Sequence, residues 1–311
     1  MKIEEAICIW LVEEFEPLFI SRQELFLNYI SIIDAGKYKS RKISGLRSNT
    51  NFLRRFDSCC EFLIESKVVL AGPKTSKGYK FFYKRQNKLK PLNAVCDLFP
   101  YGYLSFLTAM KFYNLTMISS DSIYFTTFNR NLWKEASLKH ISAKLSIDLK
   151  VIPDDYLAKM IPSYPTDQQL LGNDLIVTMD SQLKNSEFDI VQSGIRVQKM
   201  MPLLIDMTRK PQYCGGLELV LDIYKKQPLD VFEQLLPYVE KNGTDIDKAR
   251  IGFICYKLLK MEHVLLTKWI HEIQIDNKRG SSRKLVSYLP FASTFDDVWN
   301  ISLNHQTVAF H

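Results

Sequence analysis

The basic residues of this chain are concentrated in one stretch, residues 37–90. Fifteen Lys and Arg stand there against three acidic residues, Asp57, Glu61 and Glu65, so the stretch carries a net charge of +12. The whole chain carries only +7. A local excess of this size is typical of a surface that meets phosphate groups. We therefore expect residues 37–90 to bind a polyanion, and double-stranded DNA first of all.

The charge also marks a boundary within the chain. Residues 1–90 carry a net charge of +7, whereas residues 91–311 contain 24 basic and 24 acidic side chains and sum to zero. A chain of 311 residues is longer than one average domain. We predict two domains, residues 1–90 and residues 91–311, of which only the first meets a polyanion.

Apolar periodicity and capping residues predict three helices in the first domain. Residues 3–15 place apolar side chains on one face and glutamates on the other. Ser21, with Glu24 three positions later, has the spacing of a capping box and starts a helix that reaches about residue 33. Asn49 or Thr50 is expected to open the third helix.

Two short apolar runs follow, at residues 68–70 and 79–83, around a turn bounded by Gly72 and Gly78. This pattern predicts a β-hairpin. Three helices followed by a hairpin is the element order of a winged helix-turn-helix. In that arrangement the third helix enters the major groove and the hairpin, or wing, touches the DNA backbone or minor groove.

The expected DNA contacts fall in a basic connection before the third helix, on the polar face of that helix, and in the wing. They are Lys39, Arg41, Lys42, Arg47, Asn51, Arg54, Arg55, Lys74, Lys77 and Lys80. Most such cations contact phosphates and few read bases. Arg54 and Arg55 are the candidates for base reading, with a phosphate contact by one of them as an equal alternative. A flexible basic arm, an RNA-binding surface or plain solvation of helix faces would also produce this charge.

The remaining composition is that of an ordinary globular protein, with 46% hydrophobic and 24% charged residues. The apolar runs fall far short of the ~18 residues that span a membrane, and the acid-flanked N-terminal run does not resemble a signal peptide. The six cysteines are Cys8, Cys59, Cys60, Cys96, Cys214 and Cys255. They form no CxxC pair, which favours buried thiols in a reducing cytoplasm over a zinc site.

After residue 90 short strand-like and helical patterns alternate. Strand-like pieces lie at residues 120–130, 145–152, 174–178 and 195–199. Residues 101–116 and 201–207 have helical spacing, and residues 217–274 read as helices. The predicted fold class is α+β: an N-terminal winged helix-turn-helix followed by a mixed α/β domain with a helical C-terminal part.

Several of these segments resemble one known family. Residues 210–216, KPQYCGG, are similar to the rPeyCGG signature of the AbiEi family, the antitoxins of abortive-infection toxin–antitoxin systems. Residues 101–116 resemble that family's YLSLxSALxxHGL stretch, residues 250–252 its RLGyLLE segment, and LVSYLP and WNI in the tail its C-terminal end. The resemblance covers most of residues 95–304. Phe112, Tyr113 and Asn114 stand where the family has His-Gly, and the first domain shows almost no identity to it.

The resemblance implies a cytoplasmic bacterial antitoxin with two roles. The winged helix would act as a transcriptional autorepressor by binding inverted repeats in its own promoter. The second domain would counter a cognate toxin that resembles a nucleotidyltransferase, by direct or indirect action. A stand-alone winged-helix regulator and a module that sequesters an acidic protein partner are the alternatives.

We expect no catalytic residue, no cofactor, no metal and no enzymatic activity. Gly215 and Gly216 follow Cys214 without a GxxxxGK[ST] or GxGxxG pattern, so they predict a tight backbone turn or close helix packing and not a phosphate loop. Cys214 has no recognisable base and is expected to be a buried structural thiol. His263 and His271, eight residues apart, do not match a metal-ligand spacing. An enzyme acting on nucleic acid is the third alternative.

Overall fold

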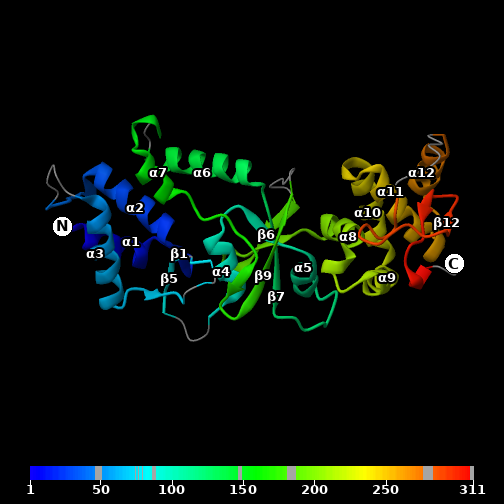
Figure 1. The fold of residues 1–311 in the computed structure, drawn as a ribbon, viewed down its shortest axis with the longest axis horizontal. Coiled ribbons are helices and arrows are strands. Elements are labelled where there is room, and N and C mark those ends of the chain that lie inside the picture. The colour runs from blue at the N-terminus through cyan, green and yellow to red at the C-terminus, as the bar shows by residue number, and fades with distance from the viewer. Residues whose placement is uncertain are drawn as a thin grey trace. The chain divides into compact units, whose positions relative to one another are not determined.

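The computed structural model describes residues 1–45, 51–73, 75, 77–78, 80–85, 89–145, 149–180, 187–275 and 283–308. Its mixture of helices and short strands agrees with the predicted α+β class (Figure 1). The chain forms two compact units, Met1–Leu104 with Asp121–Arg196, and Ser105–Ser120 with Val197–His311. The predicted limit between residues 90 and 91 falls inside the first unit.

The first unit begins with helices and a small sheet. Its first elements are α1 (Ile3–Glu13), β1 (Phe19–Ser21), α2 (Arg22–Ala35), β2 (Lys37–Tyr38), β3 (Arg41–Lys42), α3 (Phe52–Glu65), β4 (Leu70–Ala71) and β5 (Phe81–Tyr83). The helices predicted at residues 3–15 and from Ser21 are confirmed, and the Ser21 hydroxyl accepts a hydrogen bond from the Glu24 N–H at 3.1 Å. The predicted strand pair after α3 is also confirmed, and it is extended to a third strand. Antiparallel strands lie in the order β1-β5-β4.

The same unit continues with a six-stranded sheet. Its further elements are α4 (Pro91–Leu98), β6 (Gly102–Leu104), β7 (Ser122–Thr127), α6 (Arg130–Leu145), the 3₁₀ turn η1 (Leu149–Val151), α7 (Asp154–Met160), β8 (Gln168–Leu170), β9 (Asn173–Met179), β10 (Phe188–Ile190), η3 (Gln192–Gly194) and the start of β11 (Arg196–Gln198), whose last two residues belong to the second unit. The strand order is β10-β11-β6-β7-β9-β8, with β7 parallel to β9 and antiparallel to β6. The strands predicted at residues 120–130, 174–178 and 195–199 are confirmed.

Two local predictions in this part are wrong. The described residues of the strand predicted at 145–152 are not a strand, because Leu145 ends α6 and Leu149–Val151 form η1; residues 146–148 lie outside the described residues. Leu145, Leu149 and Ile152 instead pack against the core of the N-terminal helices. Residues 101–116 are not one helix either: they begin as strand β6 and become helical only at α5 (Phe106–Phe112).

Helices α6 and α7 explain why the first unit extends past residue 90. Ile141 of α6 and Met160 of α7 belong to the same core as the buried faces of α1, α2 and α3, and both helices lie along α2 (Figure 1). Helix α4 packs on β1, where the Asp97 carboxylate accepts hydrogen bonds from the N–H groups of Leu18 and Phe19 at 3.0 and 3.1 Å. The boundary in charge and the boundary in packing therefore differ.

The second unit is mainly helical. Besides α5 it contains α8 (Met200–Arg209), the 3₁₀ turn η4 (Pro211–Tyr213), α9 (Leu217–Lys226), α10 (Leu229–Asn242), α11 (Asp245–Gly252), the π-helix η5 (Phe253–Leu258), α12 (Val264–Ile275), β12 (Phe295–Asp296), β13 (Ile301–Ser302) and the 3₁₀ turn η6 (Gln306–Val308). The helices predicted from residue 201 onwards are confirmed, except that residues 259–263, between η5 and α12, are not helical. Helix α8 packs on α5, α10 and α11, and Trp269 and Trp299 are fully buried.

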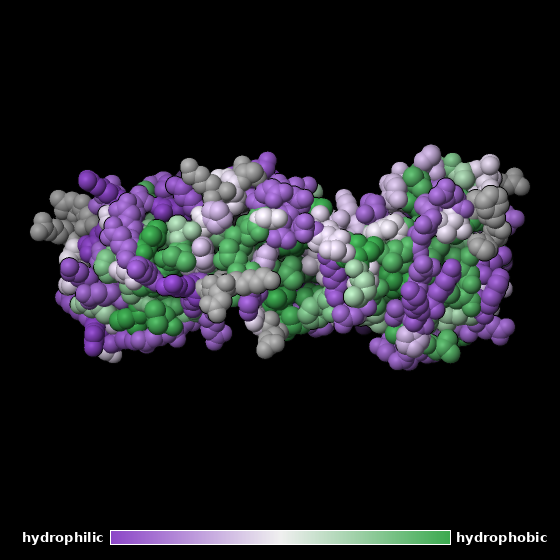
Figure 2. All heavy atoms as spheres, turned by 90° about the horizontal axis from the view of Figure 1, so that it is seen from below, coloured by the Kyte–Doolittle hydropathy of each residue, from purple (hydrophilic) through white to green (hydrophobic). Residues whose placement is uncertain are grey.

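Figure 2 shows one face of the molecule in space-filling form. In the part that holds α1, α2 and α3, hydrophilic side chains make up most of this surface, with apolar patches between them. None of the helices in the described residues combines the length and the apolar character that a membrane span needs.

Candidate nucleic-acid interface

Helix α3 exposes its N-terminal turn. Asn51 caps the helix, because its side-chain oxygen accepts a hydrogen bond from the Arg54 N–H at 3.0 Å, whereas the caps predicted at residues 49 and 50 lie outside the described residues. The side chains of Asn51 and Arg54 are exposed, as predicted, and the Arg54 guanidinium bonds no residue that the structure describes. The backbone N–H groups at this end of a helix carry a partial positive charge. The turn therefore combines a cation with a favourable dipole for an anion.

Arg55 lies in a different environment. Its Nη1 donates a hydrogen bond to the carbonyl oxygen of Gly45 at 2.6 Å, and its Nε lies 3.6 Å from Oε1 of Glu4 on α1. The Arg55 side chain is only 21% exposed. The structure places Arg55 between α3, α1 and Gly45 and not on the open face expected for it, because the partly covered Glu4 carboxylate draws the cation inward.

Strands β2 and β3 form a tight hairpin that carries three of the predicted contacts. Lys39 and Ser40, at its turn, have φ of 44° and 63°, as the two central residues of a type I′ turn do. Lys39 forms an ion pair with Glu13 of α1, so its charge is offset within the protein. Arg41 and Lys42 are exposed and bond no described residue through their side chains.

Strands β4 and β5 carry the remaining described contacts. Lys77 and Lys80, in the connection between these strands, are exposed. Glycine at position 72 lets the chain after β4 pass close to Phe81 of β5, because a Cβ at this position would lie 2.4 Å from the ring of Phe81. Arg47 and Lys74, which were also predicted to contact DNA, lie outside the described residues.

Acidic residues limit the basic surface. Asp57, Glu61 and Glu65 are exposed on α3 beyond its first turn. Asp57 forms an ion pair with Arg22 of α2, and Arg22 also donates to Sγ of Cys60 at 3.6 Å. A groove of about 560 Å³ between α3 and the β4–β5 pair is lined by the first two of these acids. Phosphate groups are therefore favoured at the first turn of α3 and disfavoured from Asp57 onwards.

Five of the predicted cations thus remain both exposed and without a described partner. They are Arg41, Lys42, Arg54, Lys77 and Lys80, which we call the open cations. Arg22, which the sequence did not single out, has a structural role. Its partner Asp57 lies 35 positions away, so no local pattern indicates the pair.

Asp97 is a partly covered carboxyl group in the first unit. Burial raises the pKa of Asp97 to about 6. The hydrogen bonds from Phe19 and Leu18 and the charges of Arg196 and Lys84 act in the opposite direction, but they offset the effect of burial only in part. Its two backbone hydrogen bonds join α4 to the start of β1. This geometry gives the residue a structural role in holding the small sheet.

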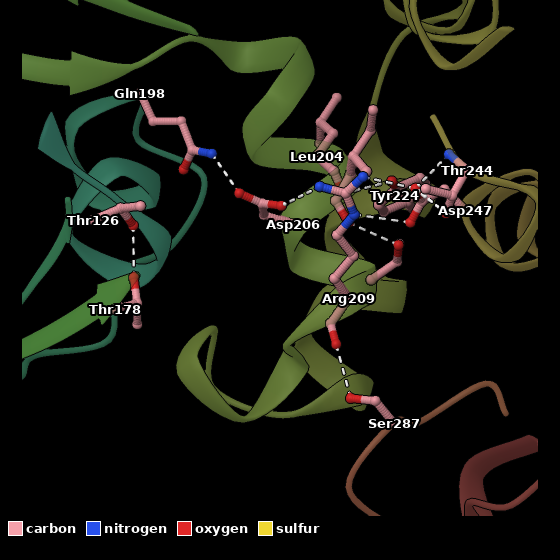
Figure 3. Close-up of polar contacts among 12 residues, drawn as sticks. Thr126, Thr178, Gln198, Leu204, Asp206, Arg209, Tyr224, Thr244, Asp247 and Ser287 are labelled. Atoms are coloured by element: carbon pink, nitrogen blue, oxygen red, sulfur yellow. Dashed lines mark hydrogen bonds and ion pairs between the residues drawn. The ribbon is translucent and has the colours of Figure 1, made fainter. Parts of the chain in front are cut away.

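The second unit contains a polar network around Arg209 (Figure 3). Nε and Nη2 of Arg209 donate to Oδ1 and Oδ2 of Asp247 at 2.9 and 2.7 Å, and Nη1 donates to Asp206 at 3.1 Å. Asp206 also accepts a hydrogen bond from Gln198 at 2.6 Å. Asp247 accepts two hydrogen bonds from the N–H and hydroxyl of Thr244, the N-cap residue of α11, and so completes a capping box. The network joins α8 to α11.

The two carboxyl groups of this network differ in pKa. Burial raises the pKa of Asp206, and the charge and hydrogen bond of Arg209 offset it only in part. Burial acts in the same direction on Asp247, but the hydrogen bonds from Arg209 and Thr244 outweigh it and lower that pKa. Asp247 is therefore the firmly ionised partner of the arginine.

The KPQYCGG segment connects α8 to α9 through η4. Cys214 is fully buried, and burial raises the pKa of its thiol, as expected of a structural cysteine. Gly215 and Gly216 have φ of 84° and 96°. A Cβ on Gly215 would lie 2.7 Å from the side chain of Leu219. Of the two alternatives predicted for these glycines, the tight backbone turn is confirmed.

Comparison with protein-family models gives no match to this chain, and a search of curated proteins gives none either. Within the described ranges no three His, Cys, Asp or Glu side chains are grouped so that they could hold a metal ion. A functional assignment therefore rests on the geometry of the open cations and on the sequence resemblance.

Proposed function

We propose that residues 1–90 form a winged helix-turn-helix and bind duplex DNA through the open cations. The element order supports this, with β1 between α1 and α2 and the β4–β5 pair after α3. The sheet order β1-β5-β4 supports it too, because it joins the first strand to the hairpin. In this arrangement α3 is the recognition helix and β4–β5 is the wing.

Arg54 is the proposed base-reading residue. The first turn of a recognition helix reaches base edges, and a guanidinium can donate two hydrogen bonds to O6 and N7 of guanine. Arg41 and Lys42 before α3, and Lys77 and Lys80 in the wing, are the proposed phosphate contacts. The observation that carries the proposal is the exposure of Arg54 on the capped first turn of α3.

We further propose that the chain is an AbiEi-type antitoxin of the bacterial cytoplasm that represses its own operon. The resemblance of residues 210–216 and the order of the other similar segments support this role. The buried Cys214 and the turn at Gly215 and Gly216 fit a signature that is needed for packing. The second partner would be a nucleotidyltransferase-like toxin, countered by the part of the chain after residue 90.

Binding to the DNA upstream of its own reading frame tests the first part of the proposal. The full chain is titrated by fluorescence anisotropy against that duplex and against a shuffled duplex, between about 50 and 200 mM salt. We expect tighter binding to the upstream duplex and a steep loss of affinity with salt, because phosphate neutralisation releases counterions. Equal affinity for both duplexes at every salt concentration would contradict repression.

Co-expression with the neighbouring reading frame tests the antitoxin role. We expect the chain to restore growth when that frame encodes a toxin, and we expect the Arg54→Ala variant to restore it equally. Loss of rescue together with loss of DNA binding in this variant would contradict two separable roles. Nuclease-resistant capture of an acidic protein, without DNA binding, would support the sequestering module instead.

A further inference from the structure

The second unit contains a cavity that the proposed function does not use. Its volume is about 460 Å³, and it lies among α9, η5, β12 and η6. Leu221, Phe253, Leu258 and Val308 form its apolar wall, in which Leu258 is partly exposed and the other three side chains are buried. Cavities of this size are typical of sites for small ligands. Four of the nine residues that line this one are apolar, and the other five are polar or charged.

Three lysines line the same cavity, Lys225, Lys257 and Lys260, against one acidic residue, Asp296. The ammonium of Lys257 lies 3.3 Å from Oδ2 of Asp296, whose other oxygen accepts a hydrogen bond from the N–H of Trp299 at 2.9 Å. Each carboxylate oxygen of Asp296 therefore already has a partner. The cavity retains an excess of positive charge, which suits an anionic ligand.

The two outer lysines are open to a ligand. Lys225 lies 3.8 Å from Asp222, but both side chains are more than half exposed, and such pairs contribute little. Lys260 is exposed and forms no ion pair with any residue in the described part of the chain. The hydroxyl of Thr307, which also lines the cavity, donates a hydrogen bond to the carboxylate of Glu218 at 3.0 Å. Glu218 therefore also has a partner already.

The backbone that carries two of the lysines is unusual. Phe253–Leu258 is π-helical, and π-helical turns occur frequently at functional sites. Lys260 follows with φ of 55°, in the left-handed region that a non-glycine residue rarely adopts. Backbone conformations of this kind cost free energy and cluster at ligand sites. Here they set the positions of Lys257 and Lys260.

We propose that this cavity binds a mononucleotide, with the phosphates on the lysines and the base against the apolar wall at Leu258. A free phosphate would use the lysines but not the apolar wall. A nucleic-acid strand needs an extended basic track, whereas this site is a cavity with three cations. A nucleoside triphosphate uses both the charge and the apolar surface.

Isothermal titration of the full chain with ATP, GTP, CTP and UTP tests the proposal, with inorganic phosphate and a short single-stranded oligonucleotide as comparison ligands. We expect at least one nucleotide to bind more tightly than inorganic phosphate. Lys225→Gln and Lys260→Asn should each weaken that binding by about tenfold, the loss of one charge-assisted hydrogen bond. Asparagine is chosen at residue 260 because it tolerates the left-handed conformation.

Lys226→Gln is the matched control, because Lys226 is the exposed neighbour of Lys225 on α9 and does not line the cavity. Arg54→Ala separates this site from the proposed DNA surface. Both variants should bind the nucleotide as the wild type does, and thermal unfolding checks that every variant is folded. Three results would overturn the proposal: no nucleotide binding, equal weakening by Lys226→Gln, or binding of the oligonucleotide alone through these lysines.

Discussion

Arg54 and Arg55 are neighbours in α3, yet Arg54 is exposed while the Arg55 guanidinium donates a 2.6 Å hydrogen bond to the carbonyl oxygen of Gly45. Successive residues of a helix point in directions about 100° apart, since one turn holds 3.6 residues. One arginine is therefore placed to meet a ligand, and the other stabilises the fold.

Substitution of each arginine by alanine should separate these two roles. We expect Arg54→Ala to weaken binding to the upstream duplex by roughly 1–3 kcal/mol and to leave the urea midpoint unchanged. Arg55→Ala should lower the free energy of unfolding by about 1 kcal/mol, because it removes the bond to Gly45 and the ion pair with Glu4. Anisotropy and urea unfolding measure the two effects. The reverse pattern would contradict the assigned roles.

The ion pair of Arg209 and Asp247 should contribute more to the free energy of unfolding than a surface ion pair does. Asp247 is fully buried and makes two hydrogen bonds to the arginine. Asp247→Ala should lower the free energy of unfolding by about 3 kcal/mol, because it leaves a partly buried guanidinium without that partner and removes the N3 side chain of the α11 capping box. Asp222→Ala, which removes an exposed pair with Lys225, should cost less than about 1 kcal/mol. Equal losses in urea unfolding would contradict this difference.

Asp97 should make stability depend on pH in the window from 3.8 to about 6. Its pKa is raised in the folded state, so the folded chain binds more protons there than the unfolded chain. Its contribution to the free energy of unfolding therefore falls as pH rises through this window. Asp97→Asn stays uncharged, and its amide oxygen can still accept from Leu18 and Phe19.

The stability of the Asp97→Asn variant relative to the wild type should accordingly increase with pH across the window and level off above it. Urea unfolding of both proteins at a series of pH values measures this difference. A constant difference would show that the Asp97 carboxyl group titrates as it does in the unfolded chain.

Gly252 should not tolerate alanine, although alanine is ordinarily the better helix former by about 1 kcal/mol. A Cβ at Gly252 would lie 2.1 Å from the indole of Trp299, so we expect Gly252→Ala to destabilise the chain by about 2 kcal/mol through overpacking. In a Trp299→Leu background the same substitution should cost less, because the contacting atoms are gone. Additive effects of the two substitutions in thermal unfolding would contradict this contact.

Local signals account for the elements that the sequence predicted correctly. The helix from Ser21 was predictable because its cap and apolar period lie within a few residues of each other. Residues 145–152 were misread because apolar and polar residues alternate there, which is typical of a strand. Their partners are the N-terminal helices, far away in the sequence, and Leu145, Leu149 and Ile152, spaced by four and three, face that core.

Prediction of the candidate site is limited in the same way, because the contacts involved join residues that are distant in the sequence. The sequence placed ten polar and basic residues in one surface, but it could not tell which of them already have partners. Lys39 meets Glu13 and Arg55 meets Glu4 across separations that no local pattern records. The same holds for Arg209 and Asp247, 38 positions apart. The number of charged residues indicates which part of the chain is basic. The structure is needed to show which of these cations already have partners and which are open cations.

The salt dependence of DNA binding tests the central claim most directly. Anisotropy titrations of the upstream duplex are compared for the wild type and for a variant with Arg41→Gln, Lys42→Gln and Lys77→Gln, three of the proposed phosphate contacts. The slope of log K against log salt should become shallower by about 2.7 in the variant, since each phosphate contact contributes about 0.9. Equal slopes for the two proteins would contradict the proposal that these open cations bind DNA.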